Sequence, residues 1–496
     1  MNNELLQSWL KWKGVIQCNF TQQVWPALHL QQASEQLSIQ LRQAGICSGD
    51  IVALSLTNTA AFPVTLFSLL AIGCNPLLLN PASPQPEVDE ITKSFQVHYL
   101  IHDFVTSRLL YGRTEQVFTF SMGTASVTLL RVDEKLRGHY TLQQEGVILH
   151  ATSGTYGKSK FCIRPQSAAV SEARNYIESI DVYNHATITL TTPLHHAFAF
   201  GFGLASALLT NSTVRLYPTF NPRILLKDLK EHPGDILTVV PPMLVSLIQL
   251  AKTSGYRMSP HVFYAGSSCS ESVSTDFQRV FNTRLYQIYG TTETGGISTS
   301  YSPEGILPGA GRPLKNVEVN IEGKNIYRAF HENAGEINVN SASMMQGYTH
   351  FTQNVHAWST GDLGFFDRDG YLHLTGRVKD IINAGGSKID PKEIEEVLLK
   401  HPDIIDAAVY PGLLQEDKEF VQAAIVTNGK QPDVAALTKY CYDRLTDYKV
   451  PVRFHLLAEI PRSAAGKCLK VKLPDFPVNY IVSEYEKGVS DLVEQK

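Results

Sequence analysis

The chain has 496 residues, of which 43% are hydrophobic and 18% are charged, and its formal net charge is −4. This length exceeds what one hydrophobic core organises, so at least two domains are expected, and the slight negative charge argues against nucleic acid as a partner. The seven cysteines form no Cys-x-x-Cys pair, which excludes the common zinc and disulfide frameworks and favours a reducing compartment such as the cytoplasm.

The N-terminal part of the chain alternates between helical and strand patterns. The predicted elements are a helix, a strand, a helix and a strand over residues 31–46, 51–56, 59–72 and 76–79. A strand, a helix and a strand in succession predict a β-α-β unit with parallel strands. The apolar run from 60 to 79 is interrupted by Asn75 and Pro76, so we expect a buried helix followed by a buried strand, and no membrane span.

The middle of the chain continues with apolar strand patterns. We expect strands over residues 98–101, 146–150, 187–190, 235–240, 262–266 and 285–290, with helices over 170–180 and 243–251. The last two of these strands each end in a glycine loop. Ligand-binding groups in open α/β sheets collect at such carboxyl ends, so these loops are candidates for a site.

After about residue 305 the pattern changes to short alternating strands separated by glycine turns, which predicts a β-rich subdomain over about 305–378. A compact α+β module follows, and its first helix begins at Pro391 after Asp390, a favourable start for a helix. We therefore predict a multidomain α/β protein with an N-terminal domain over residues 1–378 and a C-terminal domain over 379–496.

The segment 151–161, which follows an apolar strand pattern, concentrates hydroxyl groups, glycines and lysines. These are Thr152, Ser153, Gly154, Thr155, Gly157, Lys158 and Lys160. Glycines let a loop turn its backbone N–H groups inward, and such a loop suits a polyphosphate. A solvated turn is the alternative. A Walker A motif is excluded, because only two residues separate Gly154 from Gly157, where that motif needs four.

Several later segments also carry candidate chemistry, each with a structural alternative. Glu293, in the segment 289–296, could hold Mg²⁺ that bridges phosphates, or it is an exposed acid in a glycine-rich hairpin. Asp362 suits the cis-diol of a ribose but is also a common turn former. Lys467 lies on a small-residue loop that could reach an anionic transition state, or it is a solvated basic side chain.

Two more segments complete the set. Residues 193–203 combine His195 and His196 with three phenylalanines, which could wall an apolar pocket or could be packed core. Metal binding is not expected there, because no Cys, His or Asp partner stands at ligand spacing. Residues 376–391 lie where the sequence pattern changes, which is typical of a linker between domains or of a charged surface crossing.

In this order the motifs resemble those of the adenylate-forming superfamily, which includes acyl-CoA synthetases, the adenylation domains of nonribosomal peptide synthetases, and firefly luciferase. The resemblance runs from about Gly49 to Lys470 and rests on Thr-Ser-Gly-Thr…Gly-Lys, Pro-Leu-x-His, Tyr-Gly-x-Thr-Glu, Thr-Gly-Asp, Gly-Arg-x-Lys-Asp and Pro-Arg-x-x-x-Gly-Lys. It implies a large N-terminal domain of stacked sheets and a small mobile lid. It also implies that a carboxylate attacks ATP to give acyl-AMP, and that a thiol then gives a thioester.

The resemblance also implies roles for individual residues. The triphosphate is held by Thr152, Ser153, Gly154, Thr155, Gly157 and Lys158. Adenine is enclosed by Ser267, Ser268, Ile288, Tyr289 and Gly290. The ribose is held by Asp362 and Arg377, while Thr292 touches the α-phosphate and Glu293 binds Mg²⁺. Lys467 bridges the substrate carboxylate and the α-phosphate. Lys379 is the hinge of the lid, and Ala384, Gly385 and Gly386 line the thiol tunnel. The acyl pocket is formed by His196, Phe198, Phe200, Gly266 and Gly295.

The segment after His196 bears on the acid that is activated. Amino-acid-activating members carry an Asp there to pair with the substrate ammonium, and siderophore aryl-acid members tend to carry Asn directly after the histidine. This chain has Ala197 and, over residues 198–201, no carboxylate. We therefore expect a small-molecule acid with an uncharged tail, aryl or medium-chain alkyl.

The acceptor and two other classes stay open. CoA and the phosphopantetheine arm of a separate carrier protein share one reactive thiol end, and we expect a standalone ligase for either. An amino-acid adenylation enzyme, a non-catalytic nucleotide-binding relative and a luciferase-type oxygenase are the alternatives. The phosphate loop departs from the common pattern at Tyr156, Ser159 and Phe161, which bears on how it holds ATP.

Overall fold

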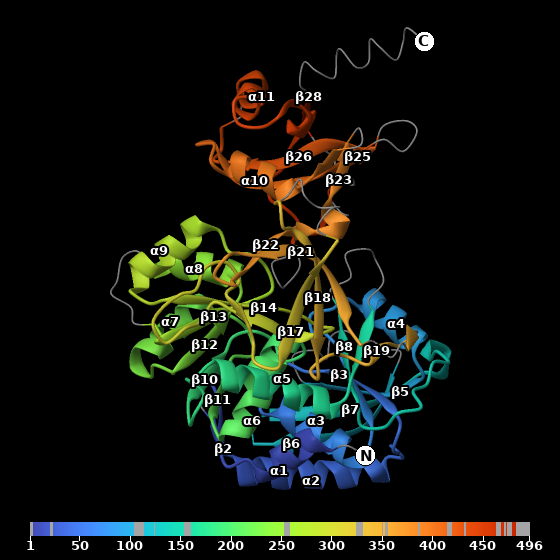
Figure 1. Ribbon diagram of the computed structural model, residues 1–496. Helices are drawn as coiled ribbons and strands as arrows, with labels where there is room; N and C mark the ends of the chain where they lie inside the picture. Colours follow the sequence, from blue (N-terminus) through green and yellow to red (C-terminus); the bar gives the residue numbers. More distant parts are fainter. Residues whose placement is uncertain are drawn as a thin grey trace. The chain divides into compact units, whose positions relative to one another are not determined.

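The computed structural model describes most of the chain (Figure 1). The described residues are 3–19, 23–103, 114–123, 125–152, 160–251, 258–323, 331–349, 351–352, 356–384, 387–413, 419–430, 433–462, 468–470, 473 and 479–482. The chain divides into two compact units. The first comprises Met1–Val319 and Val339–Trp358, and the second comprises Asn320–Asn338 and Ser359–Lys496.

One large sheet of the first unit has, among the described residues, nine strands in the order β16-β15-β14-β13-β12-β10-β11-β1-β2. The strands are β1 (Val15–Cys18), β2 (Gln23–Pro26), β10 (Thr187–Leu190), β11 (Thr213–Leu216), β12 (Ile236–Val239), β13 (His261–Tyr264), β14 (Leu285–Thr291), β15 (Gly295–Thr299) and β16 (Arg312–Pro313). The strands from β14 to β1 in this order pair in parallel. Antiparallel strands β15, β16 and β2 complete both edges.

A second sheet of the first unit also has nine strands within the described ranges, in the order β20-β19-β9-β8-β4-β3-β5-β7-β6. They are β3 (Ile51–Ser55), β4 (Asn75–Leu78), β5 (Val97–Asp103), β6 (Thr114–Met122), β7 (Ala125–Val132), β8 (Ile148–Ala151), β9 (Phe161–Arg164), β19 (Gly347–Tyr348) and β20 (Phe351–Thr352). Strands β8, β4, β3 and β5 pair in parallel. Strand β9 joins β8 to β19 in antiparallel fashion.

Helices accompany these sheets along the chain (Figure 1). They are α1 (Glu4–Lys11), α2 (Ala27–Gln43), α3 (Ala61–Ile72), α4 (Gln85–Ser94), α5 (Gln166–Ser179), α6 (Ser206–Thr210), α7 (Pro222–Glu231), α8 (Pro241–Ala251) and α9 (Glu271–Phe281). Helix α3 is buried on almost all sides, which explains its continuous apolar sequence. It connects the parallel strands β3 and β4, so the predicted β-α-β unit, and the predicted buried helix and strand over 60–79, are confirmed.

Strands β17, β18 and β21 each have residues in both units, and with β22 they form a four-stranded sheet in the order β17-β18-β21-β22. The second unit also contains, in its described part, a hairpin β23-β24 and a four-stranded sheet β25-β26-β27-β28. The strands are β17 (Val317–Glu322), β18 (Gly335–Ser341), β21 (Trp358–Phe366), β22 (Leu372–Arg377), β23 (Ile382–Ala384), β24 (Ser387–Ile389), β25 (Ile404–Leu413), β26 (Glu419–Thr427), β27 (Arg453–Leu456) and β28 (Asn479–Val482), and the helices are α10 (Pro391–Leu399) and α11 (Val434–Tyr442).

The predicted helix start at Pro391 is confirmed, because the Asp390 side chain caps α10 by accepting a hydrogen bond from the Lys392 backbone N–H at 2.9 Å. The apolar faces of α10 and α11 close a core with β25, β26 and β27. The chain is thus a multidomain α/β protein, as predicted. The placement of the domain boundary at Lys379 stays a prediction.

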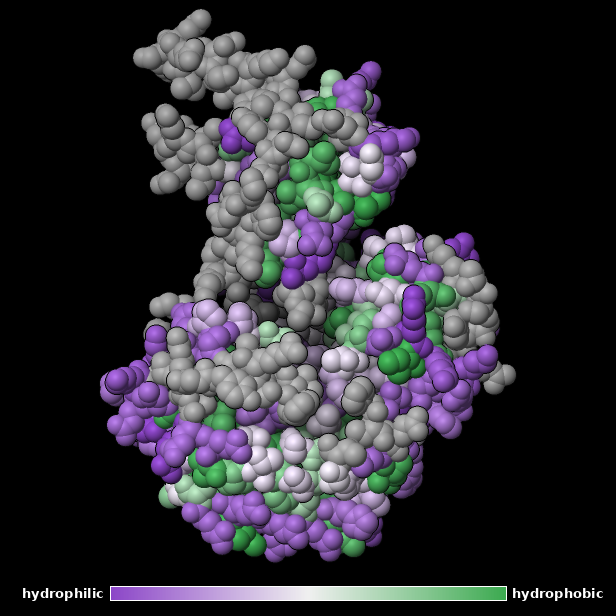
Figure 2. Space-filling view, turned by 180° about the vertical axis from the view of Figure 1, so that it is seen from behind, coloured by the Kyte–Doolittle hydropathy of each residue, from purple (hydrophilic) through white to green (hydrophobic). Residues whose placement is uncertain are grey.

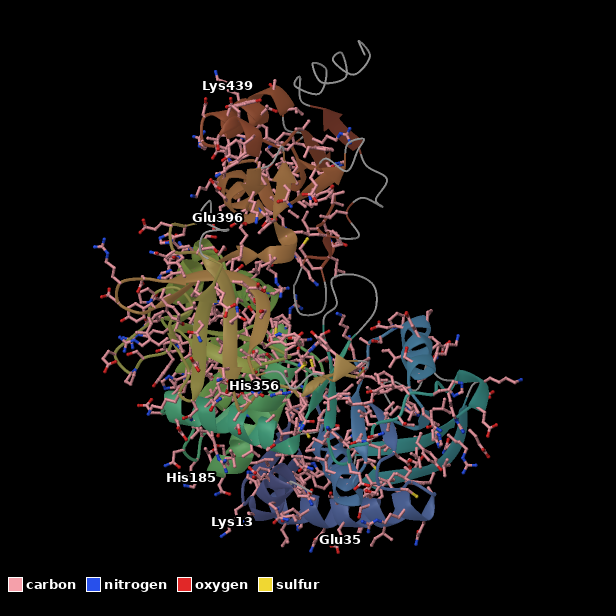
Figure 3. All side chains as sticks on the ribbon, turned by 45° about the vertical axis from the view of Figure 1, so that its right-hand side comes forward. Lys13, Glu35, His185, His356, Glu396 and Lys439 are labelled. Atoms are coloured by element: carbon pink, nitrogen blue, oxygen red, sulfur yellow. The ribbon has the colours of Figure 1, made fainter. Side chains whose placement is uncertain are left out.

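On the face shown in Figure 2, the described residues are mostly hydrophilic, and apolar residues lie among the polar ones. Charged or polar side chains such as Lys13, Glu35 and His185 lie at the periphery of the first unit (Figure 3). None of the described helices combines the length and the apolar character needed to cross a membrane.

Candidate active site

The carboxyl ends of four neighbouring parallel strands, β10, β12, β13 and β14, lie at one edge of the first sheet. Three segments with candidate residues follow these strands: Pro193–His196 after β10, Gly266–Ser268 after β13, and Thr292–Glu293 after β14. The loops after β13 and β14, which the sequence marks as candidates for a site, therefore lie at the same edge of the sheet. The sheet topology brings residues about a hundred positions apart in sequence to the same edge.

The turn that carries Thr292 and Glu293 is held by its backbone. It connects the antiparallel strands β14 and β15. The Met345 backbone N–H donates to the Glu293 carbonyl at 2.7 Å, and the Ser343 hydroxyl donates to the Thr294 carbonyl at 2.7 Å. Both carbonyls are thus fixed by the segment between β18 and β19. The position of the turn depends on that segment as much as on its own sequence.

The Glu293 side chain lies beside Tyr348, whose hydroxyl donates to Glu293 Oε1 at 2.7 Å. Burial, with the adjacent Glu293 charge, raises the pKa of Tyr348, so the phenol stays protonated and remains a donor. The ammonium of Lys160 lies 5.1 Å from the centre of the same ring. A half-buried carboxylate with one oxygen held by a phenol is a hard oxygen ligand that suits Mg²⁺.

The predicted phosphate loop connects the antiparallel strands β8 and β9. Its two ends are joined, because the Thr152 backbone N–H donates to the Lys160 carbonyl at 2.8 Å and the Thr152 hydroxyl donates to the same oxygen at 3.2 Å. Ser153, Gly154, Thr155, Gly157 and Lys158 lie outside the described residues. A strand and not a helix follows the loop, which agrees with the exclusion of a Walker A motif.

The residues predicted to enclose adenine lie at the ends of β13 and β14. Gly266 has φ +94°, a conformation that favours glycine, and exposed Ser268 follows half-buried Ser267. In β14, Ile288 and Tyr289 are buried, and the strand bulges between Tyr289 and Gly290. A side chain at Gly290 would lie 2.5 Å from the Gly295 carbonyl, so glycine is required there. The adenine role stays a prediction.

Three histidines gather where β8 faces the segment after β10. The His195 and His196 ring centroids are 4.2 Å apart, and the His150 ring stands edge-on to Phe200 at 5.0 Å. Burial, and then the nearby Arg164 charge, holds the pKa of His150 well below its usual value, and burial together with His196 lowers the pKa of His195. Both buried rings are therefore neutral at physiological pH.

The predicted pocket residues around His196 are placed by a short irregular helix. Residues Ala199–Ala205 form a π-helical segment, a feature often found at functional sites. Phe198 is half-buried and packs against Phe202 at 5.2 Å, whereas Phe200 is fully buried. Their contact with a substrate stays a prediction. The preceding loop is anchored by buried Asn58, whose side chain bonds the Thr192 carbonyl at 2.8 Å and the Leu194 N–H at 2.7 Å.

A buried ion pair joins β9 to α5 next to the candidate site residues. Arg164, at the end of β9, donates to Glu172 on α5 at 2.7 Å, and each side chain is only 1% exposed. The same Arg164 nitrogen donates to the Ser343 carbonyl at 3.2 Å, and Glu172 accepts from the Gly296 backbone N–H at 3.2 Å. Gly295, predicted to line the pocket, lies against Glu172: a Cβ there would stand 2.8 Å from the carboxyl carbon.

In the second unit, Asp362 and Arg377 form the predicted pair. They face each other across β21 and β22, with Asp362 Oδ1 and Arg377 Nε 2.7 Å apart. Lys379 is exposed in a short helical turn after β22. Lys467, Gly385 and Gly386 lie outside the described residues. The residues that flank the Lys467 segment, Arg462 and Cys468, form an antiparallel bridge, so the base of that segment is fixed.

Comparison with known proteins decides the family. A family model described as "AMP-binding enzyme" matches residues 27–349, and one described as "AMP-binding enzyme C-terminal domain" matches residues 393–467. The chain belongs to the AMP-binding enzyme family. This confirms the resemblance to the adenylate-forming superfamily.

Individual members of the AMP-binding family match over most of their length. The 2-succinylbenzoate–CoA ligase of Geobacillus kaustophilus is 29% identical over 90% of this chain and 91% of its own. The 4-coumarate–CoA ligase-like 8 of Arabidopsis thaliana is 27% identical over 89% and 85%. The fold matches that of the o-succinylbenzoate CoA synthetase from Bacillus subtilis in complex with its acyl-adenylate intermediate, with a TM-score of 0.77, 23% identity, and coverage of 96% and 99%.

As a member of the AMP-binding family, the chain is an acid–thiol ligase that uses ATP and forms an acyl-AMP intermediate. The predicted reaction class is confirmed, and neither amino-acid adenylation nor a non-catalytic role finds support among these relatives.

Sequence analysis missed the structural surroundings of the site. No role was predicted from the sequence for Arg164, Glu172, His150, Asn58 or Tyr348. The sequence did carry a signal for two of these residues, because Arg164 ends an apolar strand and Glu172 stands among small apolar residues of α5. Charged residues in such apolar surroundings are rarely buried unless they are paired, so a pair could have been expected.

Proposed function

We propose that the enzyme activates an aryl carboxylic acid and transfers the acyl group to the thiol of coenzyme A. The acid's carboxylate attacks the α-phosphorus of ATP, and pyrophosphate leaves. The thiol sulfur then attacks the acyl carbon, the bond from that carbon to the AMP oxygen breaks, and the thiol proton is released. Support comes from the relatives, whose names are those of CoA ligases, among them a 2-succinylbenzoate–CoA ligase and a 4-coumarate–CoA ligase-like protein.

The single observation that carries the choice of acid is the character of the segment after His196. Half-buried Phe198 supplies aromatic surface, Phe200 packs behind it against His150, and the buried histidines nearby are neutral. The carboxylate packed against Gly201 belongs to Glu172, and it is already paired with Arg164. A substrate ammonium group would find no free carboxylate among these residues, so an aryl acid without an ammonium group fits best.

We propose residue roles that follow the family motifs. Thr152, Ser153, Gly154, Thr155, Gly157 and Lys158 hold the leaving pyrophosphate, and Ser267, Ser268, Ile288, Tyr289 and Gly290 enclose adenine. Thr292 contacts the α-phosphate, and Glu293 holds Mg²⁺, which supplies positive charge to the phosphates when bound. Asp362 and Arg377 hold the ribose, and His196 walls the acyl pocket with Phe198, Phe200, Gly266 and Gly295. Lys467 neutralises charge on the carboxylate and the α-phosphate during adenylation.

We further propose that residues 379–496 act as a mobile lid with Lys379 as its hinge. The exposure of Lys379 supports this, because a hinge residue must change its backbone torsions without disturbing a packed core. A carrier protein is the alternative acceptor, since its phosphopantetheine presents the same thiol. A cytoplasmic location is supported by the seven cysteines, all of which are free thiols.

The proposed activity is tested by measuring pyrophosphate release with a panel of aryl, alkyl and amino acids, and by identifying products by mass spectrometry. We expect acid-dependent release that is greatest with aryl acids, and an aryl-CoA product in the presence of CoA. Preferential turnover of free amino acids, or thioester formation only on a holo-carrier protein, would overturn the assignment of substrate or acceptor.

The role of Lys467 is tested with Lys467→Ala. We expect loss of acyl-AMP formation while thioester formation from supplied acyl-AMP is retained. Lys470→Ala is the matched control, because Lys470 lies on the same segment and pairs with Glu395 at 3.3 Å. Unchanged adenylation in Lys467→Ala would refute the role.

A further inference from the structure

The buried pair of Arg164 and Glu172 joins several elements around the candidate site. Arg164 belongs to β9, directly after the phosphate loop, and Glu172 belongs to α5. Arg164 donates to the Ser343 carbonyl and Glu172 accepts from the Gly296 N–H. The pair therefore connects the strand after the loop with Ser343 and with the start of β15, which follows the Thr292–Glu293 turn.

The contacts continue to the turn itself. Ser343, whose carbonyl is held by Arg164, donates its hydroxyl to the Thr294 carbonyl at 2.7 Å. Gly296, whose N–H is held by Glu172, is the second residue of β15 after the turn. The backbone that follows Glu293, at Thr294 and Gly296, is thus fixed, directly or through one residue, by a single ion pair.

The residues packed around Glu172 leave space for its carboxylate. Glycines at 201 and 295 leave room for Glu172, because a Cβ at either place would stand 2.3 Å or 2.8 Å from its carboxyl carbon. Gly295 also has φ +73°, which favours glycine. Two segments that face α5, the π-helical segment and the start of β15, have therefore adapted to this side chain.

Stability alone does not account for the pair. A buried ion pair adds little folding stability compared with apolar residues of the same volume, because the cost of desolvating both charges offsets their attraction. Moreover, within the described part of the chain, Nε and Nη1 of Arg164 have no hydrogen-bond partner, so the guanidinium is only partly satisfied. Such a costly group is best explained by what it holds in place.

We infer that Arg164 and Glu172 are positioning residues that set the Thr292–Glu293 turn for binding of the metal and the α-phosphate in the adenylation step. This inference rests on the proposed role of Glu293. It predicts that disturbing the pair affects acyl-AMP formation and its Mg²⁺ requirement, and leaves the transfer of a supplied acyl-AMP to the thiol largely unchanged.

The test compares Arg164→Met, Glu172→Gln and the double variant. Each single variant leaves one buried charge unpaired and is expected to be less stable, whereas the double variant removes both charges and recovers folding. The double variant still lacks the Arg164 bond to Ser343. We therefore expect it to need about tenfold more Mg²⁺ for half-maximal acyl-AMP formation, the size of one lost hydrogen bond to a charged group.

Two further variants keep the outcomes distinct. Arg215→Met is the matched control, because Arg215 is also a mostly buried arginine in this unit, on β11, with bonds to Gln17 and His232. Glu293→Gln is the benchmark for the metal role. If Glu293→Gln leaves the Mg²⁺ requirement unchanged, the proposed role of Glu293 fails. The inference about the pair is overturned if Glu293→Gln raises the Mg²⁺ requirement but the double variant has the same Mg²⁺ requirement as Arg215→Met. It is also overturned if the double variant loses acyl-AMP formation and thioester formation to the same extent.

Discussion

Tyr348→Phe isolates one hydrogen bond of the candidate metal site. The change removes the hydroxyl that donates to Glu293 at 2.7 Å and keeps the ring, which stands edge-on to Trp358 at 5.6 Å and faces Lys160. A hydrogen bond to a charged group contributes about 1.5–3 kcal/mol, and water can partly replace it at this half-buried position. We therefore expect a loss of about 1–2 kcal/mol in holding the carboxylate, or about 5- to 30-fold in Mg²⁺ affinity.

The assay is pyrophosphate release at saturating ATP and acid while Mg²⁺ is titrated. We expect a higher Mg²⁺ concentration at half-maximal rate, with thioester formation from supplied acyl-AMP unchanged. Tyr99→Phe is the control, because it removes a hydroxyl that bonds the Ala44 carbonyl at 2.9 Å, remote in sequence from every candidate site residue. A Mg²⁺ titration of Tyr348→Phe that coincides with that of Tyr99→Phe would refute the placement of the metal at Glu293.

Three other predictions concern stability and the acid. Burial raises the pKa of Asp390 to about 6. The folded state therefore loses stability as pH rises from about 4 to about 6. In urea titrations, Asp390→Asn should raise the free energy of unfolding by up to about 3 kcal/mol at about pH 7.5 but should leave it unchanged at about pH 4. An equal effect of the substitution at both pH values would contradict this reasoning. Gly296→Ala places a Cβ 2.4 Å from the hydroxyl and 2.6 Å or less from two ring carbons of buried Tyr176, so it should lower the Tm, and by less in a Tyr176→Ala background; an equal loss in both backgrounds would argue against this clash. Asn58→Ala removes both bonds to the loop before His195 and should raise the KM for the acid more than that for ATP; an equal rise would indicate general loosening.

Much of the fold was predictable because apolar runs of strand length are buried strands in this protein. The β3-α3-β4 unit, the strands β10 and β12–β14, and helix α10 all lie close to their predicted ranges. Other elements carry weaker patterns. Strands β6 and β7 form a partly exposed hairpin, and β1 and β2 are short and fall outside the predicted periodic segments.

The candidate site was predictable where chemistry is local in sequence, as in the Thr292–Glu293 turn and the Asp362 and Arg377 positions. Its supporting contacts were not. Arg164 reaches Ser343 across 179 positions, and Glu172 reaches Gly296 across 124. No periodicity or short motif reports such pairs, because they depend on which strands become neighbours.

The central claim is that the acid is activated as an acyl-AMP. The most direct measurement uses an aryl acid labelled with ¹⁸O in its carboxylate and follows the label by mass spectrometry after complete turnover with ATP and CoA. Attack of the carboxylate on the α-phosphorus, followed by cleavage of the bond between that oxygen and the acyl carbon, leaves one labelled oxygen in AMP. The account predicts this label in AMP and none in pyrophosphate. Label in inorganic phosphate together with ADP, or unlabelled AMP, would contradict it.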